Sequence, residues 1–255
     1  MRKNLFALIA LLFSVSLLQA QPINAFPLDD FNVSPGFVRD TVLDGNGTWA
    51  GFNVGPTTIG GYRVIGNYMT AASPDHSFSA TEITGGAFSV NNSAVVRSAG
   101  QVIYQGSDAT PSTDAIIAHP AAFNLGNINL EATMSSPNFN FQWLVLSSDF
   151  RTWEYTVRVY TDNASNYFEA SLASNQAGVV LSLPRDSFTA VGSPSWSDVD
   201  AISFSATYND GPLGGDLAIT SLQVAVPEVS SYLLLVATVA VVGCYCWLKR
   251  HKRLA

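Results

Sequence analysis

The feature that most constrains the fold is the alternation of apolar and polar residues in short runs. In residues 153–160, WEYTVRVY, apolar side chains recur at every second position, and Glu154 and Arg158 lie between them. Successive side chains of a strand point to opposite faces, so this spacing predicts a strand with one buried face. Residues 202–207, ISFSAT, repeat the pattern.

Similar runs fill residues 21–226, and clusters of Gly, Pro, Asn, Asp and Ser separate them. No convincing amphipathic helix, linker or internal repeat divides this region. The pattern is typical of a two-layer sandwich in which each sheet hides one face. We therefore predict an all-β fold with one sandwich domain. The predicted strands are residues 61–70, 87–90, 101–104, 127–134, 139–147, 153–160, 167–172, 178–183, 201–208 and 216–224.

The charge of this region excludes one class of function. Residues 21–226 contain six arginines, no lysine and 18 acidic residues. A protein that binds nucleic acid by neutralising phosphates needs clustered Lys and Arg, so we expect no nucleic-acid partner. Both cysteines, Cys244 and Cys246, lie near the C-terminus, and the predicted domain can therefore form no disulfide.

The N-terminus has the pattern of a secretory signal peptide. Arg2 and Lys3 precede an apolar stretch over residues 5–18, which is too short to span a bilayer. We expect residues 1–20 to direct export through the Sec translocon, with cleavage after Ala20 or after Ala25.

The C-terminus has the pattern of a membrane anchor. Residues 232–248 form an uncharged apolar run that would be about 25 Å long as a helix. Positive residues remain on the cytoplasmic side, so the run predicts a stop-transfer helix in the inner membrane, with the domain in the periplasm. The basic stop-transfer residues are Lys249, Arg250, His251, Lys252 and Arg253.

Residues 226–253 combine a short Pro-Glu motif, an apolar run and a terminal basic cluster, in that order. This arrangement resembles the PEP-CTERM sorting signal. The resemblance implies processing by an exosortase, a membrane-embedded cysteine protease, and release to the cell envelope or an exopolysaccharide or biofilm matrix. Val229 departs from the family pattern, which usually has Pro there. The motif comprises Val226, Pro227, Glu228, Val229, Ser230 and Ser231.

Three segments, residues 28–31, 102–108 and 215–224, are similar to the jelly-roll domains common in PEP-CTERM proteins and to jelly-roll carbohydrate-binding modules. The resemblance implies a jelly-roll-like sandwich whose first and last strands lie side by side. It also implies a structural calcium site where acidic residues of these two strands converge. The matching positions are Asp29, Asp30 and Asp216, although solvated carboxylates are the alternative. We expect no other cofactor.

Sugar binding would require exposed aromatic faces. Trp143 and Trp153 lie in strand patterns and are expected in the core, whereas Trp49 and Trp196 lie beside turn residues. These last two are the candidates for stacking against sugar rings, with core packing as the alternative.

No catalytic residues are predicted. The glutamates Glu82, Glu131, Glu154 and Glu169 are isolated, and no paired cluster typical of glycosidases is present. The leading hypothesis is thus a non-catalytic exported envelope or matrix protein. The alternatives are a carbohydrate-binding module that recognises a polysaccharide and an unrecognised polysaccharide-acting enzyme.

Overall fold

The computed structural model describes residues 25–33, 35–43, 47–55, 58–72, 78–93, 96–105, 125–149, 151–208 and 214–226. Residues Ala25–Ala225 form one compact unit. The predicted signal peptide, the motif residues after Val226, the apolar run and the basic tail lie outside the described residues. Among the residues that are described, no helix is both long and apolar enough to cross a membrane.

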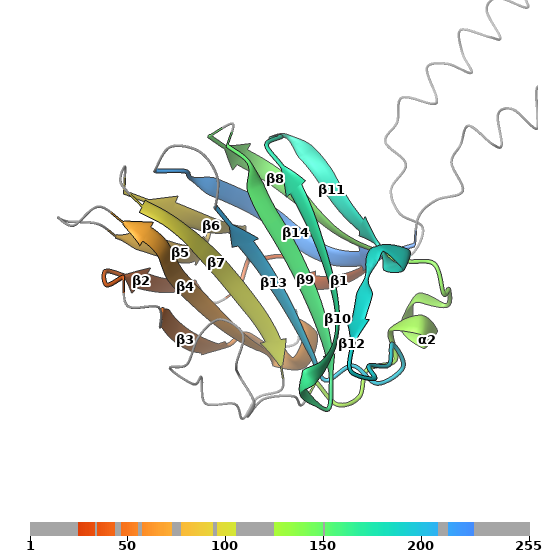
Figure 1. Ribbon diagram of the computed structural model, residues 1–255. Helices are drawn as coiled ribbons and strands as arrows, with labels where there is room; N and C mark the ends of the chain where they lie inside the picture. The colour runs from red at the N-terminus through yellow and green to blue at the C-terminus, as the bar shows by residue number, and fades with distance from the viewer. Residues whose placement is uncertain are drawn as a thin grey trace, which may run out of the picture. The chain divides into compact units, whose positions relative to one another are not determined.

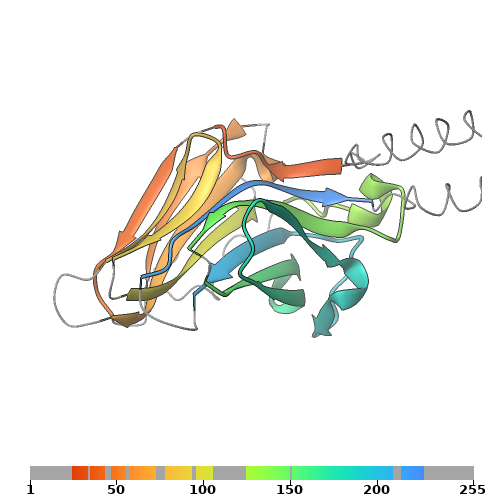
Figure 2. The same ribbon diagram turned by 90° about the horizontal axis from the view of Figure 1, so that it is seen from above.

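Within the described residues, two seven-stranded antiparallel sheets form the two layers of a sandwich (Figures 1 and 2). Sheet A has the order β11 (Val179–Pro184), β8 (Asn140–Ser148), β14 (Leu217–Ala225), β6 (Ala87–Asn92), β5 (Ser79–Thr84) and β2 (Gly36–Asp40), and β1 (Ala25–Asp29) pairs with β14. Sheet B has the order β12 (Thr189–Val191), β10 (Asn163–Ser174), β9 (Trp153–Thr161), β13 (Ala201–Thr207), β7 (Val96–Gln105), β4 (Tyr62–Ala72) and β3 (Thr48–Asn53).

The alternation read from the sequence matches the observed burial. In β9, Trp153, Tyr155 and Val157 are fully buried, and Glu154 between them is exposed. The prediction of an all-β, two-sheet sandwich is therefore confirmed. The first described strand also lies beside the last, with Asp29 opposite Leu222, as the jelly-roll resemblance implied.

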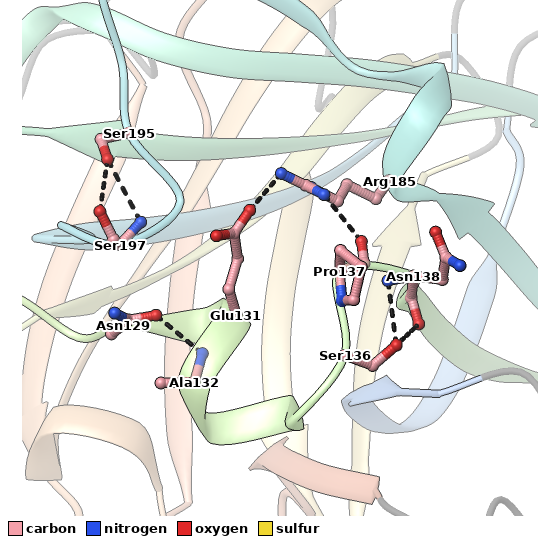
Figure 3. Close-up of polar contacts among 9 residues, drawn as sticks. All are labelled: Asn129, Glu131, Ala132, Ser136, Pro137, Asn138, Arg185, Ser195 and Ser197. Atoms are coloured by element: carbon pink, nitrogen blue, oxygen red, sulfur yellow. Dashed lines mark hydrogen bonds and ion pairs between the residues drawn. The ribbon is translucent and has the colours of Figure 1, made fainter.

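Residues 127–134 were predicted as a strand, and here the prediction is wrong. Residues Leu130–Met134 form the short helix α2. The Asn129 side chain caps it by accepting a hydrogen bond from the Ala132 amide at 2.8 Å, as Figure 3 shows. Leu130 and Met134 are both buried, because residues four apart share one helix face. Two single-turn 3-10 helices, η2 (Ile59–Gly61) and η3 (Arg185–Ser187), also connect strands.

A buried ion pair joins the two sheets. Arg63 of β4 donates from Nη1 to Oδ2 of Asp29 in β1 at 2.6 Å, and the two side chains are 0% and 1% exposed. Asp29 also accepts from the Phe31 amide, and Arg63 donates to the Val33 carbonyl. Burial raises the pKa of the Asp29 carboxyl, while Arg63 acts to lower it. A second polar contact between the sheets runs from Asn67 to Thr81 at 2.9 Å.

Replacing one partner of the ion pair should cost much more stability than replacing both. We expect Arg63→Met to lower the free energy of unfolding by about 3–5 kcal/mol, because it leaves the Asp29 carboxylate buried without its cation. The double variant Arg63→Met/Asp29→Leu should recover most of that loss. Urea denaturation of the domain measures both, and a double variant less stable than Arg63→Met would contradict the expectation.

Candidate functional site

Sheet B carries an unusual set of side chains on the face that points away from sheet A. In β4, Arg63 and Asn67 contact residues of sheet A, so the alternate residues Tyr62, Val64, Gly66 and Tyr68 point outward. The registers of the neighbouring strands extend this assignment across the sheet. We call this surface the outer face. It includes Trp49, Tyr62, Val64, Tyr68, Gln101, Ile103, Gln105, Ser203, Ser205, Arg158, Tyr160, Tyr167 and Glu169.

Two aromatic side chains lie close to backbone glycines on the β3–β4 side of the outer face. The Trp49 ring lies against Gly66, its register partner, and a Cβ atom added to Gly66 would overlap the ring. The hydroxyl end of Tyr62 lies over Gly51, where an added Cβ atom would overlap it. Both rings are half-buried. The two glycines therefore allow the rings to rest on the sheet while part of each ring remains accessible.

A glutamine lies beside each of these rings. Gln101 of β7 is the register partner of Gly66, which carries the Trp49 ring, and Gln105 is the register partner of Tyr62. The two glutamines are only 2% and 1% exposed. Even so, Oε1 of Gln101 and Nε2 of Gln105 have no hydrogen-bond partner in the described part of the chain. Several core atoms, such as Nε1 of Trp143 and Oη of Tyr155, share this state, but Gln101 and Gln105 are the ones that lie beside the two rings of the outer face, which makes them functional candidates.

The β9–β10 side of the outer face carries one ion pair and, further along β9, the exposed carboxylate of Glu154. Arg158 forms an ion pair with Glu169 and lies over the Tyr167 ring, 5.2 Å from its centroid. Burial acts to lower the pKa of the Arg158 guanidinium. The nearby Tyr160 and Glu169 act to raise it, and their combined effect is larger, so the pKa of Arg158 is raised. The guanidinium and the carboxylate thus balance each other. Rings, amides, small hydroxyls and one neutralised ion pair together suit an uncharged ligand rich in hydroxyl groups.

The structure separates the two tryptophans predicted to stack on sugars. Trp49 lies on the outer face, whereas Trp196 is 8% exposed and belongs to the core. The Trp196 ring stacks on Phe168 with centroids 4.1 Å apart and an interplanar angle of 7°. Phe139 and Phe188 meet it edge-on. Trp196 is therefore a packed side chain, and the prediction that it offers a free ring face needs correction.

Arg185 lies beside Trp196 and contacts the short helix α2. Arg185 pairs with Glu131 of α2 and donates to the Pro137 carbonyl at 2.8 Å (Figure 3). Its guanidinium lies 5.6 Å from the centroid of the Trp196 ring. Glu131 is thus occupied in a structural contact.

The three aspartates predicted to share a calcium ion do not converge. Asp29 lies opposite Leu222, whereas Asp216 precedes the start of β14, about 20 Å away along the strand. Asp29 is held by Arg63, and Asp30 accepts from the Asn32 amide. The described residues contain no group of three His, Cys, Asp or Glu side chains that could hold a metal ion.

Asp216 has a local role at the start of β14. It accepts from the Asn92 amide at 2.8 Å, and its own amide donates to Asp149. Burial raises the pKa of the Asp216 carboxyl, the Asn92 amide lowers it, and Asp149 raises it further. These contacts tie together the loops that precede β7, follow β8 and precede β14.

A hollow of about 370 Å³ lies beside β1 and η2. The described residues that line it include no charged side chain and no aromatic ring except that of Phe26, unlike those of the outer face. The lining residues are Phe26, Pro27, Thr58, Ile59, Gly60, Gly61 and Ile128.

No family model matches the chain, and no curated protein matches it. The resemblance of residues 226–253 to the PEP-CTERM signal thus has no support from these comparisons. The chain is similar to a solved structure of the family 11 carbohydrate-binding module of Clostridium thermocellum, in complex with a β-1,3-1,4-mixed-linked tetrasaccharide. The two are 10% identical, with a TM-score of 0.36, and the match covers 82% of this chain and 99% of that one.

A solution structure of a family 11 module is 13% identical, with a TM-score of 0.39 and coverage of 83% and 100%. An agarase is 9% identical, with a TM-score of 0.36, and the match covers 82% of this chain and 25% of the agarase. These TM-scores are below 0.5, so the similarities carry no argument about a ligand. What the domain binds is therefore inferred from the side chains of the outer face.

The two tryptophans should differ in their contributions to stability. We expect Trp196→Ala to lower the free energy of unfolding by about 3–5 kcal/mol, because it empties a packed aromatic cluster. Trp49→Ala should cost only about 1–2 kcal/mol, since Trp49 is only partly buried. Urea denaturation measures both values, and equal losses would refute the core placement of Trp196.

Proposed function

We propose that this protein is a non-catalytic glycan-binding domain whose outer face binds an uncharged polysaccharide. The observation that carries the proposal is the pair of half-accessible rings, Trp49 and Tyr62, each with a buried glutamine amide beside it. This function was the alternative hypothesis from the sequence, and the geometry of the outer face favours it over the leading one.

The chemistry of a sugar matches these two kinds of group. The C–H face of a pyranose ring is apolar and packs on an aromatic ring, so it gains from being removed from water. The hydroxyl groups at its edge donate and accept hydrogen bonds, as amides do. An uncharged glycan also fits the pair formed by Arg158 and Glu169, because the two charges neutralise each other there.

The glutamates of the outer face support binding rather than cleavage. Glu154 lies opposite Ala173 and Glu169 opposite Arg158, which places the two residues about 13 Å apart along the strands. Paired glycosidase carboxylates are about 5–10 Å apart. Glu169 is also engaged by Arg158.

Affinity electrophoresis in gels containing mixed-linkage β-glucan, laminarin or agarose tests the proposal. At least one of these uncharged polysaccharides should retard the native protein. Trp49→Ala and Tyr62→Ala should each weaken binding about tenfold or more, since removal of a buried aromatic anchor typically costs more than about 1.4 kcal/mol.

Phe37→Ala is the matched control. Phe37 is an aromatic residue that is 57% exposed on β2 of sheet A, the opposite sheet, so its loss should leave retardation unchanged. Absence of retardation by all three polysaccharides would refute the proposal, and so would an equal effect of Phe37→Ala and Trp49→Ala.

We also propose, from the sequence, that the domain works outside the cytoplasm. A leader at residues 1–20 would deliver it through the Sec translocon, and the apolar run at 232–248 would hold it in the inner membrane until an exosortase acts near Pro227. A position in the envelope or the exopolysaccharide matrix would place the outer face within reach of polysaccharide.

Mass spectrometry of the exported protein tests this second proposal. The expected product lacks residues 1–20 and the basic tail, and deletion of the host exosortase should restore the tail. Exported protein that keeps Lys249 and the residues after it in every copy would contradict processing, while leaving glycan binding untouched.

A further inference from the structure

The two unpartnered amides of β7 call for an explanation beyond general glycan binding. Gln101 and Gln105 are almost completely buried, yet Oε1 of the first and Nε2 of the second bond to nothing described. A buried polar atom without a partner lowers the stability of the fold. An apolar side chain of similar length, such as Met, would fill either position without that loss.

The two atoms without a partner differ in polarity. Oε1 of Gln101 accepts a hydrogen bond, and Nε2 of Gln105 donates one. A sugar hydroxyl donates and accepts, so it can satisfy either atom when the buried amide turns toward the surface on binding. A charged group could satisfy only one of the two.

The spacing of the amides points to a chain rather than a single sugar. Gln101 and Gln105 lie on the same face of β7, four residues and hence about 13 Å apart. This distance exceeds the width of one pyranose ring, so one sugar unit cannot reach both amides. Each amide is close to one ring: Gln101 is the register partner of Gly66, against which Trp49 lies, and Gln105 is the register partner of Tyr62, whose side chain extends over Gly51 of β3.

We propose that Gln101 with Trp49 and Gln105 with Tyr62 form two subsites that bind non-adjacent units of one extended, uncharged sugar chain lying along β7. The inference rests on the proposed function and makes it specific. Each ring holds the apolar face of its sugar unit, and each amide bonds to a hydroxyl of that unit. The ligand is consequently a linear segment of at least three units, and the amides determine which hydroxyl pattern it must present.

Gln101→Met and Gln105→Met separate this role from a structural one. We expect each variant to unfold at a temperature equal to or above that of the native protein, because it removes a buried polar atom that has no partner. Each variant should also bind the polysaccharide that retards the native protein about tenfold more weakly. A group that only supports the fold would not give higher stability together with weaker binding.

Oligosaccharides of two to six units, prepared from that polysaccharide, test the two-subsite geometry by calorimetry. The native protein should gain affinity steeply between two units and four or more. Gln105→Met should flatten this gain, because only the subsite at Trp49 remains complete.

Gln142→Met is the matched control. Gln142 lies on β8 of sheet A and accepts a hydrogen bond from Gln223, so its replacement should leave binding unchanged and should not raise stability. Native-like binding by Gln101→Met and Gln105→Met, alongside a loss in Trp49→Ala, would overturn the inference and leave glycan binding standing. A lower unfolding temperature in both glutamine variants would overturn it as well. Failure of the native protein to bind any of the polysaccharides would remove the proposed function itself.

Discussion

The ion pair between Arg63 and Asp29 is the interaction on which the outer face depends. Arg63 reaches inward from β4 to sheet A, and the pleat of the strand then turns Tyr62 outward. The register partner of Arg63 on β7 is Tyr104, which also points inward. The next residue, Gln105, therefore lies on the outer face. A slip of one residue in β4 would bury Tyr62 and expose the arginine. The buried charge therefore fixes the register that pairs each ring with an amide.

The two faces of sheet B carry different side chains. The inner face stabilises the fold, and the outer face carries the proposed binding groups. The inner face packs aromatic and aliphatic side chains such as Val157 and Phe204 against sheet A. The outer face instead carries rings resting on glycines, amides without partners and a balanced ion pair. Some of these features reduce stability, which is common where a surface is arranged for a ligand.

Local patterns in the sequence predicted what depends on one strand at a time. Alternation gave the buried side of β9 and the sandwich class, and the turn residues beside Trp49 made it one of the two candidates for stacking on a sugar. Contacts between residues that are far apart in the sequence could not be predicted from these local patterns. The stacking of Trp196 on Phe168 buries a tryptophan that its own neighbours suggest is exposed. The Asn129 cap turned an apparent strand into α2, and the β1–β14 register separated the proposed calcium ligands. The rings and the two glutamines, Gln101 and Gln105, become neighbours only through the register in which β4 and β7 pair.

The most direct test of the account is a nuclear magnetic resonance titration of the labelled domain with an uncharged hexasaccharide. The account predicts that the side-chain amide signals of Gln101 and Gln105 and the indole signal of Trp49 shift together. The indole signal of Trp196 and the amide signal of Gln142 should remain in place, since both lie away from the outer face. Shifts confined to sheet A, or binding that leaves both β7 amides unmoved, would contradict it.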